Sequence, residues 1–342
     1  MLIVMAQVSF VVRYKNKKMA SLQNSSVTGN TVLDKATCNV TAGGFLWYNT
    51  STCRLNYSYS GAGAASWSTT SQMITPRRLL GGGGTVNTTL ALPGYKDGSG
   101  VVNCVEKFDG SSWSSAGSMI INGYYTAVAG TQNAALSTGR YNGPTLGRCT
   151  EAYNGSSWST GGALNVNRIS LDMAGTPSAT LAFFGNVIGV GVGTCTEKYD
   201  GTSWSNATGG ISGRWRSWGA GTQNAAIIFG GSPSTNLETY NGTSWTSGPA
   251  MITGRQLLAG TGNGSSTSAL AFGGYNTLSC TESWNGSSWS TATALISGRH
   301  HNAGSGGGNT SALAFGGYQS PSKVYPAPNV YASSVSINVC VL

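Results

Sequence analysis

The chain has 342 residues and a formal net charge of +9, but only 8% of its residues are charged, against about 25% in an average soluble domain. Its 51 glycines suggest disorder, yet 10 tryptophans, 15 tyrosines and 8 phenylalanines exclude it, because disordered segments are poor in aromatic residues. The basic residues are scattered apart from a run at 13–18, and no segment approaches the ~20 apolar residues of a membrane helix, so neither nucleic-acid binding nor a membrane span is expected.

Residues 1–62 are predicted to form an N-terminal arm and attachment segment. The first twelve residues are apolar, but positive charges follow this run, whereas a secretory signal carries them before it. Met19 is an alternative translation start. Cys38 and Cys53 form the one candidate disulfide. Four other cysteines recur at equivalent positions of different repeats and should lie beyond the roughly 7 Å Cα limit for pairing: Cys104, Cys149, Cys195 and Cys280.

From residue 63 to residue 320 the chain repeats a unit that contains a phrase close to Asn-Gly-Ser-Ser-Trp-Ser. A period of about 45 residues, with short apolar runs and glycine pairs, is typical of a β-propeller rather than of a helical solenoid. We therefore predict an all-β protein with six blades in residues 63–320. The tryptophans of the repeated phrase are Trp67, Trp113, Trp158, Trp204, Trp245 and Trp289.

The unit at 251–294 illustrates the four strands expected in each blade. In its second strand, the large side chains of Leu270 and Phe272 alternate with alanines, which gives each sheet one bulky and one small face for stacking. Asn285-Gly286, between the third and fourth strands, predicts a type I′ hairpin in which both central residues have positive φ. The four strands are expected at 255–260, 268–274, 280–284 and 288–292.

The two ends of the repeat array complement each other. The last unit lacks a Trp-containing outer strand, while Trp67 belongs to such a strand with no blade before it. The economical interpretation is that residues 66–70 form the outer strand of the last blade, which closes the ring and leaves no open edge. Residues 321–342 are predicted to be a C-terminal tail that begins irregularly at its prolines and contains an extra strand at 330–341.

Each unit has a fixed order of residues, which in one unit reads Arg214, Gly230-Gly231, Glu238-x-Tyr240 and Trp245. This order resembles the Kelch repeat, which implies a Kelch-like propeller. The resemblance covers residues 67–318 and is clearest in the last three units, while the second unit lacks both the arginine and the glycine pair.

A second resemblance concerns short phrases. Ala-Gly-Thr-Gln-Asn-Ala-Ala and Ala-Leu-Ala-Phe-Gly-Gly resemble repeats in structural proteins of marine and cyanobacterial tailed phages, and residues 43–67 resemble a short module of phage tail and fibre proteins. This resemblance implies a component of the virion, without saying which one.

The sequence offers few groups for catalysis. Five of the acidic residues share one repeat position, and Asp34, Asp97 and Asp172 stand outside the repeat. Nothing marks out the pair of carboxylates, about 5–10 Å apart, that a glycosidase needs. His300 and His301 are adjacent, so on a strand they should point to opposite faces and not share a metal. We expect no enzyme, no metal and no cofactor.

Two groups of residues are candidates for ligand binding. Trp215 and Trp218 interrupt the repeat beside Arg216, where they would stack on a sugar ring, plug the axial channel or pack under the N-terminal arm. The repeated arginines begin the innermost strands, where they would ring one mouth of the channel as an anion site for acidic sugars, or bond to a neighbouring blade's glutamate or backbone carbonyls. The candidate ligand residues are Trp215, Trp218, Arg214, Arg216, Arg255, Arg299 and His300.

These observations favour a non-enzymatic structural protein of a tailed-phage virion, a propeller that serves assembly, adhesion to host surface glycans, or both. The N-terminal segment is expected to attach it to other virion proteins, as one copy in a symmetric homo-oligomeric assembly. The alternative is a secreted lectin or carbohydrate-active enzyme on a Kelch-like or sialidase-like propeller.

Overall fold

The computed structural model divides the chain into two compact units. Unit 1 comprises Met1–Ala65 with Ala332–Leu342, and unit 2 comprises Ser66–Tyr331. The structure describes residues 65–318 and 328–332, except 144–145, 233–235 and 262–263, and elsewhere only the backbone of the strands of unit 1. The side chains of Cys38 and Cys53 lie outside the described residues.

Unit 1 contains short antiparallel sheets drawn from both ends of the chain. The predicted C-terminal tail strand at 330–341 is in fact two strands, β34 (Asn329–Ala332) and β35 (Ser336–Cys340), and only β35 belongs to unit 1, where it pairs with β5. The tail is therefore divided between the units. The other strands of unit 1 are β1 (Ser9–Tyr14), β2 (Lys17–Gln23), β3 (Cys38–Asn39), β4 (Gly44–Asn49) and β5 (Arg54–Tyr59).

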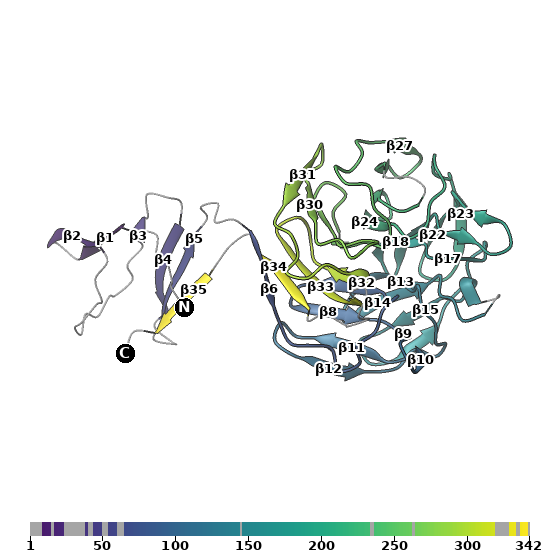
Figure 1. Ribbon diagram of the computed structural model, residues 1–342, viewed down its shortest axis with the longest axis horizontal. Coiled ribbons are helices and arrows are strands. Elements are labelled where there is room, and N and C mark those ends of the chain that lie inside the picture. Colours follow the sequence, from purple (N-terminus) through teal and green to yellow (C-terminus); the bar gives the residue numbers. More distant parts are fainter. Residues whose placement is uncertain are drawn as a thin grey trace. The chain divides into compact units, whose positions relative to one another are not determined.

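Unit 2 is all-β and consists of small four-stranded antiparallel sheets in a propeller-like arrangement, with their innermost strands toward a common centre (Figure 1). From the innermost strand outward, the first sheet contains β7 (Gly82–Thr85), β8 (Thr88–Ala91), β11 (Val105–Phe108) and β12 (Trp113–Ala116). The second contains β13 (Ala127–Thr131), β14 (Ala134–Thr138), β15 (Glu151–Tyr153) and β16 (Trp158–Thr160). The third contains β18 (Asp172–Thr176), β19 (Ala179–Phe183), β22 (Thr196–Tyr199) and β23 (Trp204–Ala207).

The later sheets follow the same order. The fourth contains β24 (Trp218–Thr222), β25 (Ala225–Phe229), β26 (Glu238–Tyr240) and β27 (Trp245–Ser247). The fifth contains β28 (Ala259–Gly260), β29 (Ala269–Phe272), β30 (Thr281–Trp284) and β31 (Trp289–Ala292). The last contains β32 (His300–Ser305), β33 (Ser311–Tyr318), β34 and β6 (Ser66–Thr69). Small accessory pieces are β9 (Gly94–Lys96), β10 (Gly100–Val102), β17 (Arg168–Ile169), β20 (Asn186–Val187), β21 (Gly191–Val192) and a 3₁₀ turn, Leu146–Arg148.

The innermost strands contact one another in chain order, and β32 of the last sheet also contacts β7 of the first. The edge strand of the last sheet is β6, which comes from the start of unit 2. Thr70 N donates to Pro328 O at 3.0 Å beside this edge. The indole of Trp67 donates to Thr293 O at 2.9 Å and packs edge-on against Phe272, with ring centroids 5.1 Å apart. The two ends of unit 2 are therefore joined within one sheet.

The repeated tryptophans lie between neighbouring sheets. Trp113 is 8% exposed, and its ring lies 5.1 Å from Phe108 in its own sheet and 5.3 Å from Phe315 in the last sheet. Trp158 Nε1 donates to Gly117 O, at the end of the preceding sheet, over 2.9 Å. The repeated tryptophans thus bury their rings between sheets, and five of them also hydrogen-bond through the indole N–H, which is the usual arrangement of a buried indole. The exception is Trp289, whose Nε1 has no partner among the described residues.

The loops between third and fourth strands differ from the predicted type I′ hairpin. Trp284 pairs with Trp289, which leaves a four-residue loop in which only Gly286 has positive φ, at +94°. The side chain of Asn285 closes this loop, since its Oδ1 accepts from Ser287 N and Ser288 N, both at 2.9 Å. The asparagine is required for these hydrogen bonds to the backbone rather than for a left-handed conformation of its own.

The glutamine of the Ala-Gly-Thr-Gln-Asn phrase connects adjacent sheets. Gln132 Nε2 donates to Thr89 O at 3.0 Å and to Phe108 O at 2.8 Å, both in the preceding sheet. Gln223 makes the same two bonds to the third sheet, over 3.2 and 2.7 Å. This phrase therefore has a structural role in holding the sheets together.

Candidate functional site

The repeated arginines do not begin the innermost strands, contrary to the prediction, but lie one to five residues before them, and their guanidinium groups turn into the sheets instead of lining an open mouth. Each pairs with the glutamate on the third strand of its own sheet, not of a neighbouring one, and Arg299 of the last sheet instead donates to Asn329 Oδ1 at 2.9 Å. The predicted ligand residues Arg214, Arg255 and Arg299 are 0%, 4% and 0% exposed. Their guanidinium groups are therefore bonded to groups within the fold and do not face a ligand. The pairs are Arg77–Glu106, Arg140–Glu151, Arg168–Glu197, Arg214–Glu238 and Arg255–Glu282.

In the second sheet the arginine occupies a different position in the sequence but the same place in space. Gly123 stands where the other sheets have arginine, and Arg140, after the second strand, pairs with Glu151. A Cβ on Gly123 would lie 2.9 Å from Cβ of Arg140, so the side chain of Arg140 occupies the space that a side chain at position 123 would need. The sequence pattern showed the missing arginine at 123 but not its replacement at 140.

Two residues after each arginine position, one residue per sheet adopts a left-handed conformation near the axis. Leu79 N donates to His301 O at 2.9 Å, and Tyr125 N donates to Leu79 O at 2.8 Å; the same bond joins the fourth to the fifth sheet and the fifth to the last. We call this ring the mouth. Its members have φ between 50° and 60°: Leu79, Tyr125, Ser170, Arg216, Leu257 and His301.

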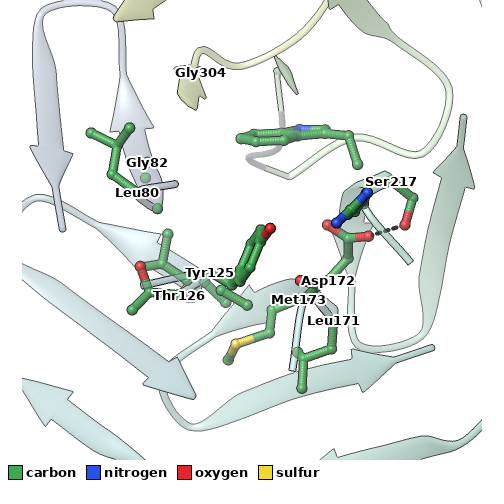
Figure 2. Close-up of a pocket in the computed structure, with 18 of the residues that line it drawn as sticks. Leu80, Gly82, Tyr125, Thr126, Leu171, Asp172, Met173, Ser217 and Gly304 are labelled. Atoms are coloured by element: carbon green, nitrogen blue, oxygen red, sulfur yellow. Dashed lines mark hydrogen bonds between the residues drawn. The ribbon is translucent and has the colours of Figure 1, made fainter. Parts of the chain in front are cut away.

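Below the mouth the innermost strands enclose an axial cavity of about 110 Å³. Tyr125 and Asp172 extend into it, and Ser217 Oγ donates to Asp172 Oδ2 at 2.6 Å (Figure 2). Asp172 and Trp218 occupy one equivalent position of adjacent sheets, where the other sheets have glycine or alanine. Gly219 and Gly260 make room for them, because a Cβ there would lie 2.8 Å from Asp172 Cβ and 2.9 Å from Trp218 Cδ1, respectively.

Several polar atoms that line this cavity have no hydrogen-bond partner among the described residues. Buried polar groups are nearly always satisfied by protein, water or a ligand, so these atoms give the cavity a polar interior with unused hydrogen-bonding groups. The atoms are Ser170 Oγ, Arg216 Nε, Trp218 Nε1, His301 Nδ1, and Oδ1 and Nδ2 of Asn302. Of the predicted ligand residues, the structure brings Arg216 and Trp218 to the cavity lining.

The electrostatics of the cavity are set by burial and by two arginines. Burial raises the pKa of Asp172 from 3.8 to about 7, against the opposing effect of its hydrogen bonds from Ser217 and Gly219. Burial, His300, Arg78 and Arg216 together lower the pKa of His301 from 6.5 to about 3. His301 is therefore neutral at physiological pH, and Asp172 carries only part of a charge.

These two shifts predict opposite effects of pH on stability. Because the pKa of Asp172 is higher in the folded state, its stabilising contribution is present below about pH 4 and is lost as the pH rises through about 7. The folded-state pKa of His301 is lower, so His301 destabilises the fold as the pH falls from about 6.5 toward 3. We expect Asp172→Asn to lose more stability than the wild type, on the order of 1–2 kcal/mol, on acidification from about pH 7.5 to about pH 4.5. Urea unfolding at the two pH values measures this difference. An equal change in the free energy of unfolding in the two proteins would contradict it.

Around the mouth lies a rim of aromatic side chains. Trp215 stands one residue before the mouth residue of its sheet, and the Arg216 guanidinium lies 3.8 Å from its ring centroid. Tyr95 and Tyr318 flank Arg78, whose guanidinium lies 4.8 and 5.0 Å from their ring centroids. The rim consists of Tyr95, Tyr124, Tyr141, Trp215, Tyr275 and Tyr318, linked in part by ring contacts through His300.

Most of this rim was not identified from the sequence. Tyr95, Tyr275 and Tyr318 each follow directly on a glycine, and Tyr141 follows Arg140. The recurrence of a tyrosine at this place in several units is the sequence signal that could have identified the rim.

The two histidines lie closer together than adjacent strand residues should. Their ring centroids are 4.8 Å apart, because His301 has a φ of +55° that breaks the alternation of the strand. The two side chains therefore do not point to opposite faces, contrary to the prediction. His300 is 5% exposed and stacks edge-on against Tyr318 at 4.2 Å. No cluster of three potential metal ligands occurs among the residues that the structure describes.

The mouth belongs to the face of unit 2 that carries the connections between fourth and first strands and between second and third strands. In an antiparallel sheet these connections leave from the same end. All the large apolar side chains that are exposed in the described part of the chain belong to these connections, and the opposite face carries the polar turns. They are Ile74, Ile120, Tyr141, Val190, Val192, Ile211, Ile252, Tyr275 and Ile296.

Comparison with known proteins found no matching family model and no match among curated proteins. In the described part of the chain, no helix has the length and apolar character needed to cross a membrane.

Proposed function

We propose that unit 2 is a six-bladed, Kelch-like propeller closed by β6, and that it is a non-catalytic module that binds saccharides at its mouth. The observation that carries this proposal is the aromatic rim around a polar axial cavity. Aromatic faces pack well against the C–H faces of sugar rings, and unpaired donors and acceptors below them suit hydroxyl groups. The exposed apolar side chains on the same face support its role as the contact surface.

The dimensions of the cavity limit how a ligand is held. Its volume of about 110 Å³ is small beside the ~300–1,000 Å³ of pockets that enclose a drug-sized ligand. The cavity therefore admits only the tip of a saccharide, while the rest of the ligand lies on the rim. This mode of binding suits the end of a chain on a glycan-coated surface.

Catalysis is not part of the proposal. Among the described residues that line the cavity, Asp172 is the one carboxylate. Glycosidases use two, one as acid and one as base or nucleophile. Incubation with polysaccharides separates the two functions, because product release would identify a carbohydrate-active enzyme and binding alone a lectin.

We also propose that the protein is a structural component of a tailed-phage virion, attached to other virion proteins through unit 1 as one copy of a symmetric assembly. The resemblance of short phrases to repeats of phage structural proteins supports this setting, and the rim supports adhesion to host glycans. Mass spectrometry of purified particles tests it. Absence of the protein from them would favour a secreted lectin.

Removal of a rim aromatic is expected to weaken saccharide binding. Trp215→Ala and Tyr275→Ala should each weaken binding about 10-fold or more, since an aromatic anchor at a binding centre contributes about 1–3 kcal/mol. A glycan array identifies the ligand, and isothermal titration calorimetry measures the change. Val190→Ser, an exposed residue of the same face outside the rim, is the control and should bind like the wild type. Unchanged affinity in both rim variants would refute the assignment of the site.

A further inference from the structure

Arg216 is placed at the mouth by sequence choice and not by the needs of the fold. All members of the mouth share its left-handed backbone, yet the other five are leucine, tyrosine, serine, leucine and histidine. The carbonyl of Arg216 accepts from Leu257 N at 2.9 Å, a backbone bond that any side chain permits. The guanidinium therefore has no structural role that the ring requires.

The guanidinium of Arg216 is also unlike that of the other arginines around the axis. The buried arginines pair with a glutamate, or with Asn329 in the last sheet, and Arg78 pairs with Asp97 at 3.1 Å. Arg216 is half-buried and makes no ion pair or side-chain hydrogen bond within the described residues. Its plane is held against Trp215, which orients its forked donors without using them.

The groups around Arg216 do not neutralise it. The neighbouring imidazole of His301 is uncharged, and Asp172 is hydrogen-bonded to Ser217 and held partly protonated by burial. Ser170, which is 8% exposed, has a hydroxyl without a partner beside the same cavity. The mouth thus combines one oriented cation with neutral hydrogen-bonding groups and an aromatic rim.

We infer that the mouth selects saccharides whose terminal ring carries an anionic group, a carboxylate or a sulfate, and that Arg216 binds this group. The inference rests on the proposed saccharide-binding function and specifies its ligand class. Bidentate hydrogen bonds from a guanidinium to a carboxylate or sulfate are stronger than neutral ones. The ring of the same sugar lies against the aromatic rim, and its hydroxyls reach the polar atoms of the cavity.

The test compares one polymer with and without its charge. Oligogalacturonate and its methyl ester have the same sugar ring, so calorimetry should show the acid form binding about 10- to 100-fold more tightly, as a charge-assisted hydrogen bond predicts. Arg216→Gln should remove this preference and leave the affinity for the ester unchanged. Arg148→Gln, an exposed arginine outside the cavity lining, should bind like the wild type. A sulfated galactan tests the sulfate arm in the same way.

Each remaining outcome separates the inference from the function on which it rests. Equal binding of acid and ester by the wild type, or an undiminished preference in Arg216→Gln, would overturn the anionic specificity and leave saccharide binding intact. Binding of free acetate or sulfate as tightly as the acidic saccharide would overturn it in favour of a simple anion site. No binding of any saccharide would remove the proposed function itself.

Discussion

Deletion of residues 1–70 is expected to unfold unit 2, whereas deletion of residues 1–64 leaves it folded. The longer deletion removes β6, exposes the edge of β34 and withdraws the buried Trp67, which is 7% exposed. Loss of a buried tryptophan alone costs roughly 3–5 kcal/mol, against a total stability of about 5–15 kcal/mol for a folded domain. Circular dichroism and thermal unfolding of the two truncated proteins measure the difference.

The shorter truncation serves as the matched control, since the two proteins differ by six residues. A cooperative unfolding transition at the same temperature in both would show that β6 is dispensable and that closure of the ring does not depend on it. A third truncation, of residues 1–40, should keep the folded ring and abolish assembly into particles, because it removes part of unit 1 alone. Loss of the fold in that protein would refute the division between attachment and propeller.

In the fifth sheet the sequence predicted the second, third and fourth strands closely, because their determinants are local, whereas the first strand expected at 255–260 is only β28, Ala259–Gly260. In the fifth unit the expected strand at 268–274 is β29, and Phe272 contacts Trp67 while the alanines of the same strand pack with Ile227 and Phe229 of the neighbouring sheet. Period-two alternation records this difference between the faces directly. The loop after Trp284 was assigned the wrong turn type because the dipeptide Asn-Gly does not reveal how many residues separate the paired positions.

The candidate site was predicted only in part, because it depends on contacts between sheets. Trp218 and Arg216 were recognised as departures from the repeat, and the structure places both at the cavity. The six left-handed residues of the mouth are of five different types, so no pattern reveals them. The destination of Arg214 also depends on Glu238, which lies two strands away in its sheet, and sequence position alone does not show whether a guanidinium turns inward or toward the axis.

Removal of a single repeated glutamate is expected to destabilise unit 2 strongly. Glu282→Ala leaves Arg255 buried without its carboxylate, to which it now donates at 2.9 Å, and leaves Ile252 N and Thr253 N without their acceptor. Breaking one side of a buried ion pair costs about 3–5 kcal/mol, since the remaining charge stays out of water. A shift of the urea unfolding midpoint measures this loss. Asp200→Asn is the control and should not shift the midpoint, because asparagine occupies the equivalent turn position as Asn154, Asn241 and Asn285.

Two further variants separate the cost of an unpaired charge from the loss of hydrogen bonds. Glu282→Gln keeps an oxygen for the backbone donors, and the last sheet already holds Arg299 with the neutral amide of Asn329, so it should cost less than Glu282→Ala. The double variant Arg255→Met/Glu282→Leu removes both charges and should recover much of the lost stability, because an apolar pair of similar volume replaces a buried ion pair at little net cost. Equal losses in the single and double variants would instead assign the effect to the backbone bonds of Ile252 and Thr253, which the double variant cannot restore.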